Sequence, residues 1–128
     1  MYLLSICIPT FNREKNLEKM LNSIKLNSHV EIIVCDDGST DKTNQLLKNH
    51  FNIPNLKYIF QKNSGVSAAM LNAYQNSTGK YVIKMDSDDL FTDNGLDFIL
   101  DTLRDNPKID AFLYGVKTIK RNISSKNS

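Results

Sequence analysis

Short apolar runs alternate with amphipathic stretches along most of the chain, and this alternation restricts the fold more than any other feature of the sequence. The apolar runs have the length of β-strands and cover residues 3–8, 30–35, 56–60, 81–85 and 109–116. Strands that alternate with helices form parallel sheets joined by right-handed crossovers. The sequence therefore predicts a doubly wound α/β fold, a mostly parallel sheet with helices on both faces. We expect the strand order 3-2-1-4, followed by strand 5.

The stretches between the strands have the periodicity of amphipathic helices. Their apolar or small positions are Leu17, Met20, Leu21 and Ile24, then Leu46, Leu47 and Phe51, then Ala68, Ala69 and Ala73, and finally Leu96, Ile99, Leu100 and Leu103. We expect Asn12 to cap the first helix, Asp93 or Asn94 to begin the fourth, and Pro107 to end it. Gly79 is interpreted as the C-cap of the third helix or as a turn residue before the fourth strand.

The size and composition of the chain suit one globular domain. With 128 residues and 41% hydrophobic content it can bury a core, and its net charge of +2 indicates no nucleic-acid partner. It shows neither a signal peptide nor an apolar run of about 20 residues, so we expect no transmembrane segment and a cytoplasmic location, at most peripheral to the inner face of the membrane. Cys7 and Cys35 lie in strand-like runs, which favours reduced, buried thiols. We expect residues 121–128 to form a disordered polar tail.

The fourth strand runs directly into three carboxylates, Asp86, Asp88 and Asp89. On an extended chain Asp86 and Asp88 point the same way, and Asp89 can turn back toward them past the strand end. Carboxylates this close repel one another unless they bind a cation, and a hard divalent ion such as Mg²⁺ or Mn²⁺ prefers oxygen ligands. Such an ion keeps positions open for substrate phosphate, so the cluster indicates diphosphate chemistry. An Asp-rich turn that caps the next helix is the structural alternative.

The second strand also ends in acids, because Asp36 and Asp37 follow residues 30–35. In doubly wound sheets, ligands bind beyond the carboxyl ends of the strands, where the strand order reverses. If strand one lies between strands two and four, residues 9–12 share a crevice with Asp37 and with residues 86–89. This composite site favours a ligand-binding function. A receiver-like Mg²⁺-binding signalling domain is a rival, although its acid pair follows the first strand, where this chain has no carboxylate.

Several motifs follow one another in a fixed order. They are SICIPTFNR at residues 5–13, EIIVCDDGSTD at 31–41, NSGVSAA at 63–69, TGKY at 78–81 and DSDD at 86–89. Together they resemble the family 2 glycosyltransferases of GT-A fold, and the resemblance covers nearly the whole chain up to about the fifth strand. It implies that residues 1–120 form the nucleotide-sugar-binding half of a GT-A, Rossmann-like domain.

The resemblance also implies a role for each motif. The end of strand one would hold the nucleobase largely through backbone groups, and the loop at residues 63–67 would close over the nucleotide. Asp37 would accept a hydrogen bond from the base, which favours uracil. The substrate-binding residues implied are Pro9, Thr10, Phe11, Asp37, Asn63, Gly65, Asp86 and Asp88. A turn position for Asp37 and a helix-entry position for Thr10 are the structural alternatives.

The reaction implied is transfer of a sugar, with inversion, from a nucleotide-diphospho-sugar, a UDP-sugar above all, to a saccharide or lipid-linked acceptor. A base would deprotonate the acceptor hydroxyl as the diphosphate leaves from the opposite face. Mn²⁺ or Mg²⁺, held directly by Asp88 or Asp89, would stabilise the charge on the leaving group. The frequent Asn, Lys and Ile are typical of AT-rich bacterial genomes, in which members of this family build surface polysaccharides.

Two features depart from the family pattern. Many relatives have Ala-Arg-Asn after the glycine loop, whereas residues 69–72 here are Ala-Met-Leu-Asn, so a basic residue expected near the diphosphate is missing. Members of the family are also much longer, and their later half supplies the acceptor pocket and the catalytic base. We therefore expect the base beyond residue 128 and a donor-binding portion that does not complete turnover alone. A non-catalytic nucleotide-binding module is the alternative.

Overall fold

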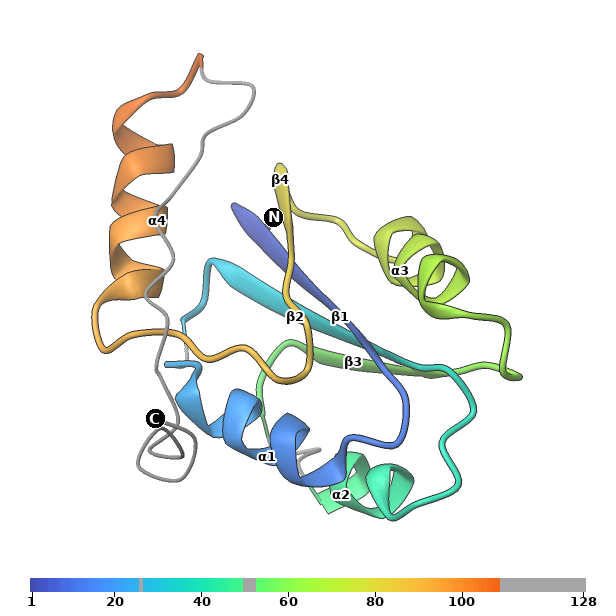
Figure 1. Cartoon of the computed structure of the whole chain (residues 1–128). Coiled ribbons are helices and arrows are strands. Elements are labelled where there is room, and N and C mark those ends of the chain that lie inside the picture. Colours follow the sequence, from blue (N-terminus) through green and yellow to red (C-terminus); the bar gives the residue numbers. More distant parts are fainter. Residues whose placement is uncertain (26, 50–52, 109–128) are drawn as a thin grey trace, which may run out of the picture.

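The computed structural model describes residues 1–25, 27–49 and 53–108, in which strands and helices alternate (Figure 1). The strands are β1 (Leu4–Thr10), β2 (Val30–Asp36), β3 (Leu56–Phe60) and β4 (Tyr81–Lys84). They form a parallel sheet in the order β3-β2-β1-β4. The predicted order of the first four strands is therefore confirmed. The fifth candidate strand, residues 109–116, lies outside the described residues.

The helices are α1 (Glu14–Ser23), α2 (Thr43–Asn49), α3 (Val66–Gln75) and α4 (Gly95–Asp105). Right-handed crossovers place each helix according to the direction in which the chain moves along the sheet. From β1 to β3 the chain moves one way, with α1 and α2 on one face. From β3 to β4 it moves back, so α3 covers the opposite face (Figure 1). The doubly wound architecture with helices on both faces is confirmed.

The two faces of the sheet carry hydrophobic cores of different size. The main core joins alternate residues of β1 and β2 to the buried faces of α1, α2 and α4. On the other face, Ala69 and Ala73 of α3 pack against Cys7, Ile33 and Cys35. The small positions predicted for this helix are thus the ones that pack on the sheet, apart from the partly buried Ala68. No helix in the described ranges is both long enough and apolar enough to cross a membrane.

Most of the apolar positions predicted for the four helices are buried, and both cysteines are buried free thiols, as expected. Burial raises the pKa of Cys7 and of Cys35 to about 11, so both thiols are protonated at neutral pH. Leu46 and Ala68 are only partly buried, and Phe51 lies outside the described residues.

β1 extends to Thr10, past the predicted end of the strand, and includes Pro9. A proline inside a sheet normally removes a hydrogen bond of the ladder. Along β1, alternate residues face alternate neighbours, and Cys7 faces β4 because its carbonyl accepts from the backbone N–H of Met85. Pro9 faces the same side, where the pairing with β4 has already ended at Lys84. The missing N–H therefore costs no ladder bond.

The prediction that Asn12 caps α1 is wrong. The N-cap is Arg13, which makes no side-chain capping bond, and Asn12 adopts a positive φ of 51°. The Asn12 side-chain oxygen instead accepts hydrogen bonds from the backbone N–H groups of Thr40 (2.8 Å) and Asp41 (3.3 Å). Asp41 in turn accepts from the backbone N–H of Glu14 at 3.3 Å, in the first turn of α1. These bonds join the loops that follow β1 and β2.

β4 is half-buried, because β1 is its one neighbour in the described sheet. Gly79, just before β4, is not a helix cap, since Asn76 caps α3. It lies in the bend before β4, the other predicted position. A Cβ at Gly79 would meet the backbone nitrogen of Ser5 at 2.7 Å, so the connection passes very close to β1.

A fully buried carboxylate, Glu31, holds the connection between α3 and β4 at the amino ends of the strands. It accepts hydrogen bonds from the Ser5 hydroxyl (2.8 Å) and from the backbone N–H and hydroxyl of Thr78 (2.6 and 3.0 Å). The Lys57 ammonium completes the network at 3.3 Å. Burial alone would raise the pKa of Glu31, but these partners outweigh it and lower that pKa below its ordinary value.

Candidate functional site

A cleft of about 550 Å³ opens beyond the carboxyl ends of β1, β2 and β4. It is lined by Pro9, Thr10, Phe11, Arg13, Asp37, Asn63, Gly65, Val66, Ala69, Asp86, Ser87 and Asp88. All eight residues selected from the sequence as substrate-binding are among them. They come from segments far apart in the sequence and meet because parallel strands end at one edge of the sheet. Asp89, selected as a metal ligand, does not line the cleft but lies beside Asp86.

Asp37 is held in the cleft by hydrogen bonds to both of its carboxylate oxygens, and the residue is 4% exposed. Oδ1 accepts from the Gln61 side-chain amide (2.9 Å) and the Ser64 backbone N–H (2.7 Å), and Oδ2 accepts from the Gly65 backbone N–H (3.0 Å). Burial favours the protonated acid, but these bonds outweigh it and lower the pKa of Asp37 below its ordinary value. Asp37 is therefore ionised at neutral pH and acts as a hydrogen-bond acceptor.

The loops after β2 and β3 pack backbone against backbone around Asp37. Gly38 has a φ of 79°, a left-handed conformation that glycine adopts without strain. A Cβ at Gly38 would lie 2.8 Å from the backbone nitrogen of Asn63. This close contact, together with the bonds from Ser64 and Gly65, holds the loop that begins at Gln61 against Asp37.

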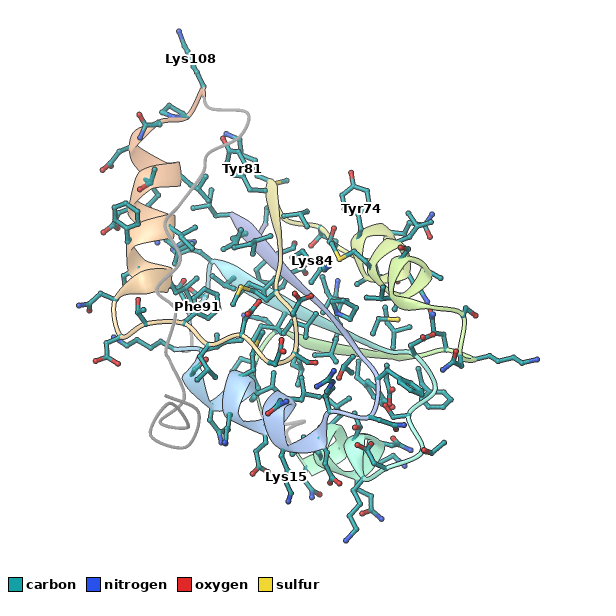
Figure 2. The ribbon with its side chains drawn as sticks, in the orientation of Figure 1. Lys15, Tyr74, Tyr81, Lys84, Phe91 and Lys108 are labelled. Carbon is teal, nitrogen blue, oxygen red and sulfur yellow. The ribbon has the colours of Figure 1, made fainter. Side chains whose placement is uncertain are left out.

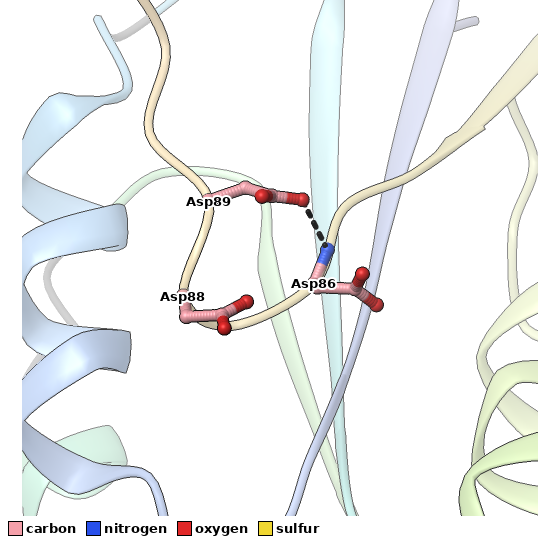
Figure 3. Close-up of side chains that lie close together, drawn as sticks. All are labelled: Asp86, Asp88 and Asp89. Atoms are coloured by element: carbon pink, nitrogen blue, oxygen red, sulfur yellow. Dashed lines mark hydrogen bonds between the residues drawn. The ribbon is translucent and has the colours of Figure 1, made fainter. Parts of the chain in front are cut away.

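The three carboxylates after β4 gather on a turn (Figure 3). Because β4 ends at Lys84, they do not alternate on an extended strand as predicted; instead, Asp89 accepts a hydrogen bond from the backbone N–H of Asp86 at 3.2 Å. Each residue offers one ligand oxygen, and these oxygens all lie within 4.8 Å of one another. Lys84 forms an ion pair with Asp86 at 3.4 Å. A set of exposed carboxylate oxygens fits Mg²⁺ or Mn²⁺ better than a softer metal.

Thr10 lines the cleft with a hydroxyl that is buried and has no hydrogen-bond partner within the described part of the chain. A buried polar atom of this kind costs free energy unless a ligand or an ordered water satisfies it. If Thr10 capped the first helix, its hydroxyl would accept a hydrogen bond from that helix, and no such bond is present among the described residues. Next to it, Phe11 is 42% exposed and is also among the residues that line the cleft.

Arg13, Ser87 and Gln61 are site residues that the sequence reasoning did not select. Arg13 is the one cationic side chain among the residues that line the cleft. The signal that could have identified it is its position, because it follows strand one at the same edge of the sheet as the acids. For Gln61, no spacing rule indicates that its side chain contacts Asp37.

A second, smaller groove of about 370 Å³ lies between the outer side of α3 and β4, lined by Val66, Ser67, Met70, Leu71, Tyr74 and Lys84. Tyr74 projects from α3 away from the sheet (Figure 2). Met70 and Leu71, which follow Ala69 where the resemblance implies a basic residue, line this groove and are not among the residues of the cleft. Arg13, the cationic residue of the cleft lining, is the N-cap of α1, which packs on the other face of the sheet from α3.

Comparisons with known proteins support the reading of these motifs. The chain matches the family model described as "Glycosyl transferase family 2" over residues 5–126. A curated relative, chondroitin synthase of Escherichia coli, is 35% identical over 130 residues, which covers 98% of this chain. The chain spans 18% of the length of that relative.

Solved structures show the same fold. TarS 1–349 of S. aureus in complex with UDP-GlcNAc superposes with a TM-score of 0.76 at 30% identity, covering 84% of this chain and 32% of that one. The mannosyltransferase PcManGT from Pyrobaculum calidifontis, in complex with GDP-Man and Mn²⁺, gives a TM-score of 0.67 over 79% of this chain and 32% of that one. At 23% identity, this second likeness shows the fold alone.

The family match spans both the cleft motifs and the sheet that carries them, and it rules out the receiver-like signalling domain. The relatives include an enzyme of polysaccharide synthesis and a structure with a bound nucleotide-sugar. The chain belongs to glycosyltransferase family 2 and has the GT-A fold.

Proposed function

We propose that the cleft binds the nucleoside diphosphate of a UDP-sugar, and that the chain is the donor-binding part of an inverting, metal-dependent glycosyltransferase. The observation that carries this proposal is the cleft itself. Its lining includes an ionised, hydrogen-bonded Asp37, residues 86–88 of the acid turn at 86–89 and a Thr10 hydroxyl that has no hydrogen-bond partner in the described part of the chain, all at one edge of the sheet. A nucleotide has a base at one end and a diphosphate at the other, so one nucleotide could contact both Asp37 and the acid turn.

In this proposal the base lies at the end of β1, against Pro9, Thr10 and Phe11. Asp37 accepts an N–H of the base. The loop that contains Asn63 and Gly65 covers the nucleotide from the side of β3. The TarS complex supports a uridine nucleotide, because that protein binds UDP-GlcNAc and is 30% identical to this chain.

The acid turn then lies at the ribose and the diphosphate. Asp86 and Asp88 line the cleft and face the ribose and the metal, with Asp88 and Asp89 as the metal ligands. A bound Mn²⁺ or Mg²⁺ would stabilise the charge that develops on the leaving diphosphate. Arg13 supplies the positive side chain that Met70 does not, because a guanidinium pairs well with phosphate oxygens.

The acceptor hydroxyl and its base complete the reaction in the whole enzyme. The ionised side chains of the cleft are all assigned to the base, the ribose, the metal or the diphosphate, and a carboxylate that binds a cation is a poor proton acceptor. A nucleotide-binding module without turnover is therefore the second candidate. Acceptor-dependent release of UDP from UDP-GlcNAc by the full-length gene product separates the two functions, because a binding module gives no release even in that context.

The experiment that tests the donor site is calorimetric titration of UDP into the chain with and without Mn²⁺. We expect binding that Mn²⁺ strengthens and that Asp88→Asn weakens at least about tenfold, because one metal ligand loses its charge. Asp93→Asn is the matched control, since Asp93 is exposed and lies outside the acid cluster. Equal UDP affinity with and without Mn²⁺ would overturn the metal assignment, and absence of UDP binding would overturn the proposal.

A further inference from the structure

The number of hydrogen bonds that Asp37 already makes limits what it can offer to a ligand. An ionised carboxylate has about four acceptor positions, two on each oxygen. Within the described residues, Oδ1 accepts from Gln61 and Ser64, and Oδ2 accepts from Gly65. Oδ1 is therefore fully used, and Oδ2 keeps a single acceptor position.

The Gln61 side chain is fixed in the orientation that gives this result. Its amide nitrogen must face Asp37, because a carboxylate accepts hydrogen bonds and donates none. Its oxygen then faces α3, where it accepts from the Asn72 amide at 3.0 Å and from the Cys35 thiol at 3.4 Å. Asn72 is oriented in the same way, since its own oxygen accepts from the Asn76 amide at 3.1 Å. A directed chain of amides thus runs from the exposed side of α3 to the cleft.

Nucleobases differ in how many N–H groups they direct at a carboxylate. Uracil presents a single N–H between two carbonyls, so one acceptor position satisfies it. Guanine presents two parallel N–H groups, which need one acceptor position on each oxygen of the carboxylate. Donor groups that lack an acceptor are costly when a base is buried. The difference decides between uridine and guanosine donors, both of which occur among the solved structures of this fold.

We propose that Gln61 and Asn72 are positioning residues that set base selectivity: they leave Asp37 one free acceptor position and thereby select uracil against guanine. The inference rests on the proposed function, because it assumes that Asp37 meets the base. Gln61 acts by occupying Oδ1 and by fixing the plane of the carboxylate. Asn72 acts on Gln61, because its donation to the Gln61 oxygen prevents the Gln61 amide from rotating by about 180°.

The test is the ratio of UDP to GDP affinity, measured by calorimetry with Mn²⁺ for the parent chain, Gln61→Met and Asn72→Asp. The parent is expected to prefer UDP. Gln61→Met keeps the size of the side chain and frees Oδ1, so the ratio is expected to fall roughly tenfold, the scale of a paired base contact. Asn72→Asp replaces the group that donates to Gln61 by an acceptor. The Gln61 amide is then expected to rotate by about 180°, so that its nitrogen faces residue 72 and no longer donates to Asp37. The ratio is expected to fall in the same direction.

The ratio distinguishes a selectivity role from a structural one. Both nucleotides carry the same diphosphate, so a general loss of affinity, or the added charge of Asn72→Asp, cancels in it. Gln75→Met is the matched control, the same substitution at an exposed position of α3, and is expected to keep the parent ratio. A parent that binds GDP as tightly as UDP, or an unchanged ratio in folded Gln61→Met, overturns the inference.

The remaining outcomes also test the inference. If Gln61→Met does not fold, as judged by circular dichroism, Asn72→Asp settles the question, and an unchanged ratio there overturns the inference. If Gln61→Met lowers the ratio and Asn72→Asp does not, the part assigned to Asn72 is overturned. Binding of neither nucleotide by the parent overturns the proposed function, and the inference with it, whereas binding with an unchanged ratio overturns the inference alone.

Discussion

Thr10 and Asp37 both line the cleft and both are buried, yet only the side chain of Asp37 has hydrogen-bond partners among the described residues. The Asp37 carboxylate is held by the loop after β3, whereas the Thr10 hydroxyl has no partner in the described part of the fold. A polar atom that is paired within the fold contributes to stability, and one that is unpaired reduces it. At the scale of single residues, Thr10 is therefore the position where stability and ligand binding can be separated.

Thr10→Val is expected to leave the free energy of unfolding unchanged or to raise it by up to about 1 kcal/mol, because it removes an unpartnered buried hydroxyl. The same substitution is expected to weaken UDP binding severalfold if the hydroxyl contacts the nucleotide. Urea denaturation and calorimetry measure the two effects.

Thr43→Val is the matched control for Thr10→Val. Thr43 is equally buried, but its hydroxyl donates to Asp41. We expect the control to lose roughly 1–2 kcal/mol of stability and to keep the UDP affinity of the parent. A loss of stability in Thr10→Val as large as in Thr43→Val would contradict the assignment of an unpartnered hydroxyl.

At the scale of elements, the connection between α3 and β4 is held by charge as well as by close packing. Glu31 reaches from β2 across the sheet to Ser5 of β1 and to Thr78 before β4. Lys57 of β3 adds the opposite charge. One carboxylate therefore joins β1, β2 and β3 to the connection that leads into β4, at the edge opposite the cleft. This connection holds the start of β4, and the acid turn follows at its other end.

Glu31→Gln is expected to lower the free energy of unfolding at pH 7 by roughly 1–3 kcal/mol, because hydrogen bonds to a buried charged group are lost or weakened. The pKa of Glu31 is lowered in the fold, so its ionised form stabilises the protein above the pKa of the unfolded chain. That stability is lost as the pH falls through the lower, folded pKa. The difference between parent and variant, measured by urea denaturation, should therefore shrink below about pH 4.5.

Glu18→Gln is the control for this pH series, since Glu18 is exposed on α1 and is expected to change stability by less than about 0.5 kcal/mol. A Glu31→Gln difference that stays constant from neutral pH down to acid unfolding would show that the charge of Glu31 does not stabilise the fold.

At the scale of the whole molecule, the cleft depends on the loops after β1, β2, β3 and β4 together. The loops after β1 and β2 are joined through Asn12 and Asp41, and the loop after β3 is joined to β2 through Asp37. The acid turn after β4 is not joined to the others by a hydrogen bond among those described. A diphosphate and a metal that contact the acid turn and the first three loops would add the missing connection.

UDP and Mn²⁺ together are therefore expected to raise the Tm by more than the sum of their separate effects, because each increases the affinity for the other. A ligand present at 100 times its Kd adds about 2.7 kcal/mol to the free energy of unfolding. Thermal denaturation with UDP, Mn²⁺ and both measures this coupling. Uridine is the control, since it lacks the diphosphate and should show no coupling with Mn²⁺; equal coupling with uridine would place the metal away from the diphosphate.

Much of the candidate site followed from the sequence because parallel strands bring their carboxyl ends to one edge of the sheet. Once the strand order was predicted, Pro9, Asp37 and Asp86 had to lie near one another, whatever the details of their loops. The early end of β4 and the contacts of Asn12 could not be predicted. β4 ends at Lys84, before the first of the three acids, so Asp86 and Asp88 lie on a turn and not on the strand. A loop asparagine can accept hydrogen bonds from any backbone N–H group within reach, and spacing along the chain does not say which.

By itself, the sequence determined the sheet, its strand order, its helices and the edge at which the polar residues gather. Hydrophobic periodicity indicates which residues of a helix or strand are buried, and the crossovers between parallel strands are almost always right-handed. The tertiary structure alone decided that Gln61 donates to Asp37, that the Arg13 residue lines the cleft and that Glu31 accepts from Thr78. Each of these contacts joins loops or strand ends that are distant in sequence, and its geometry depends on how closely the segments pack. Spacing along the chain carries no information about those distances.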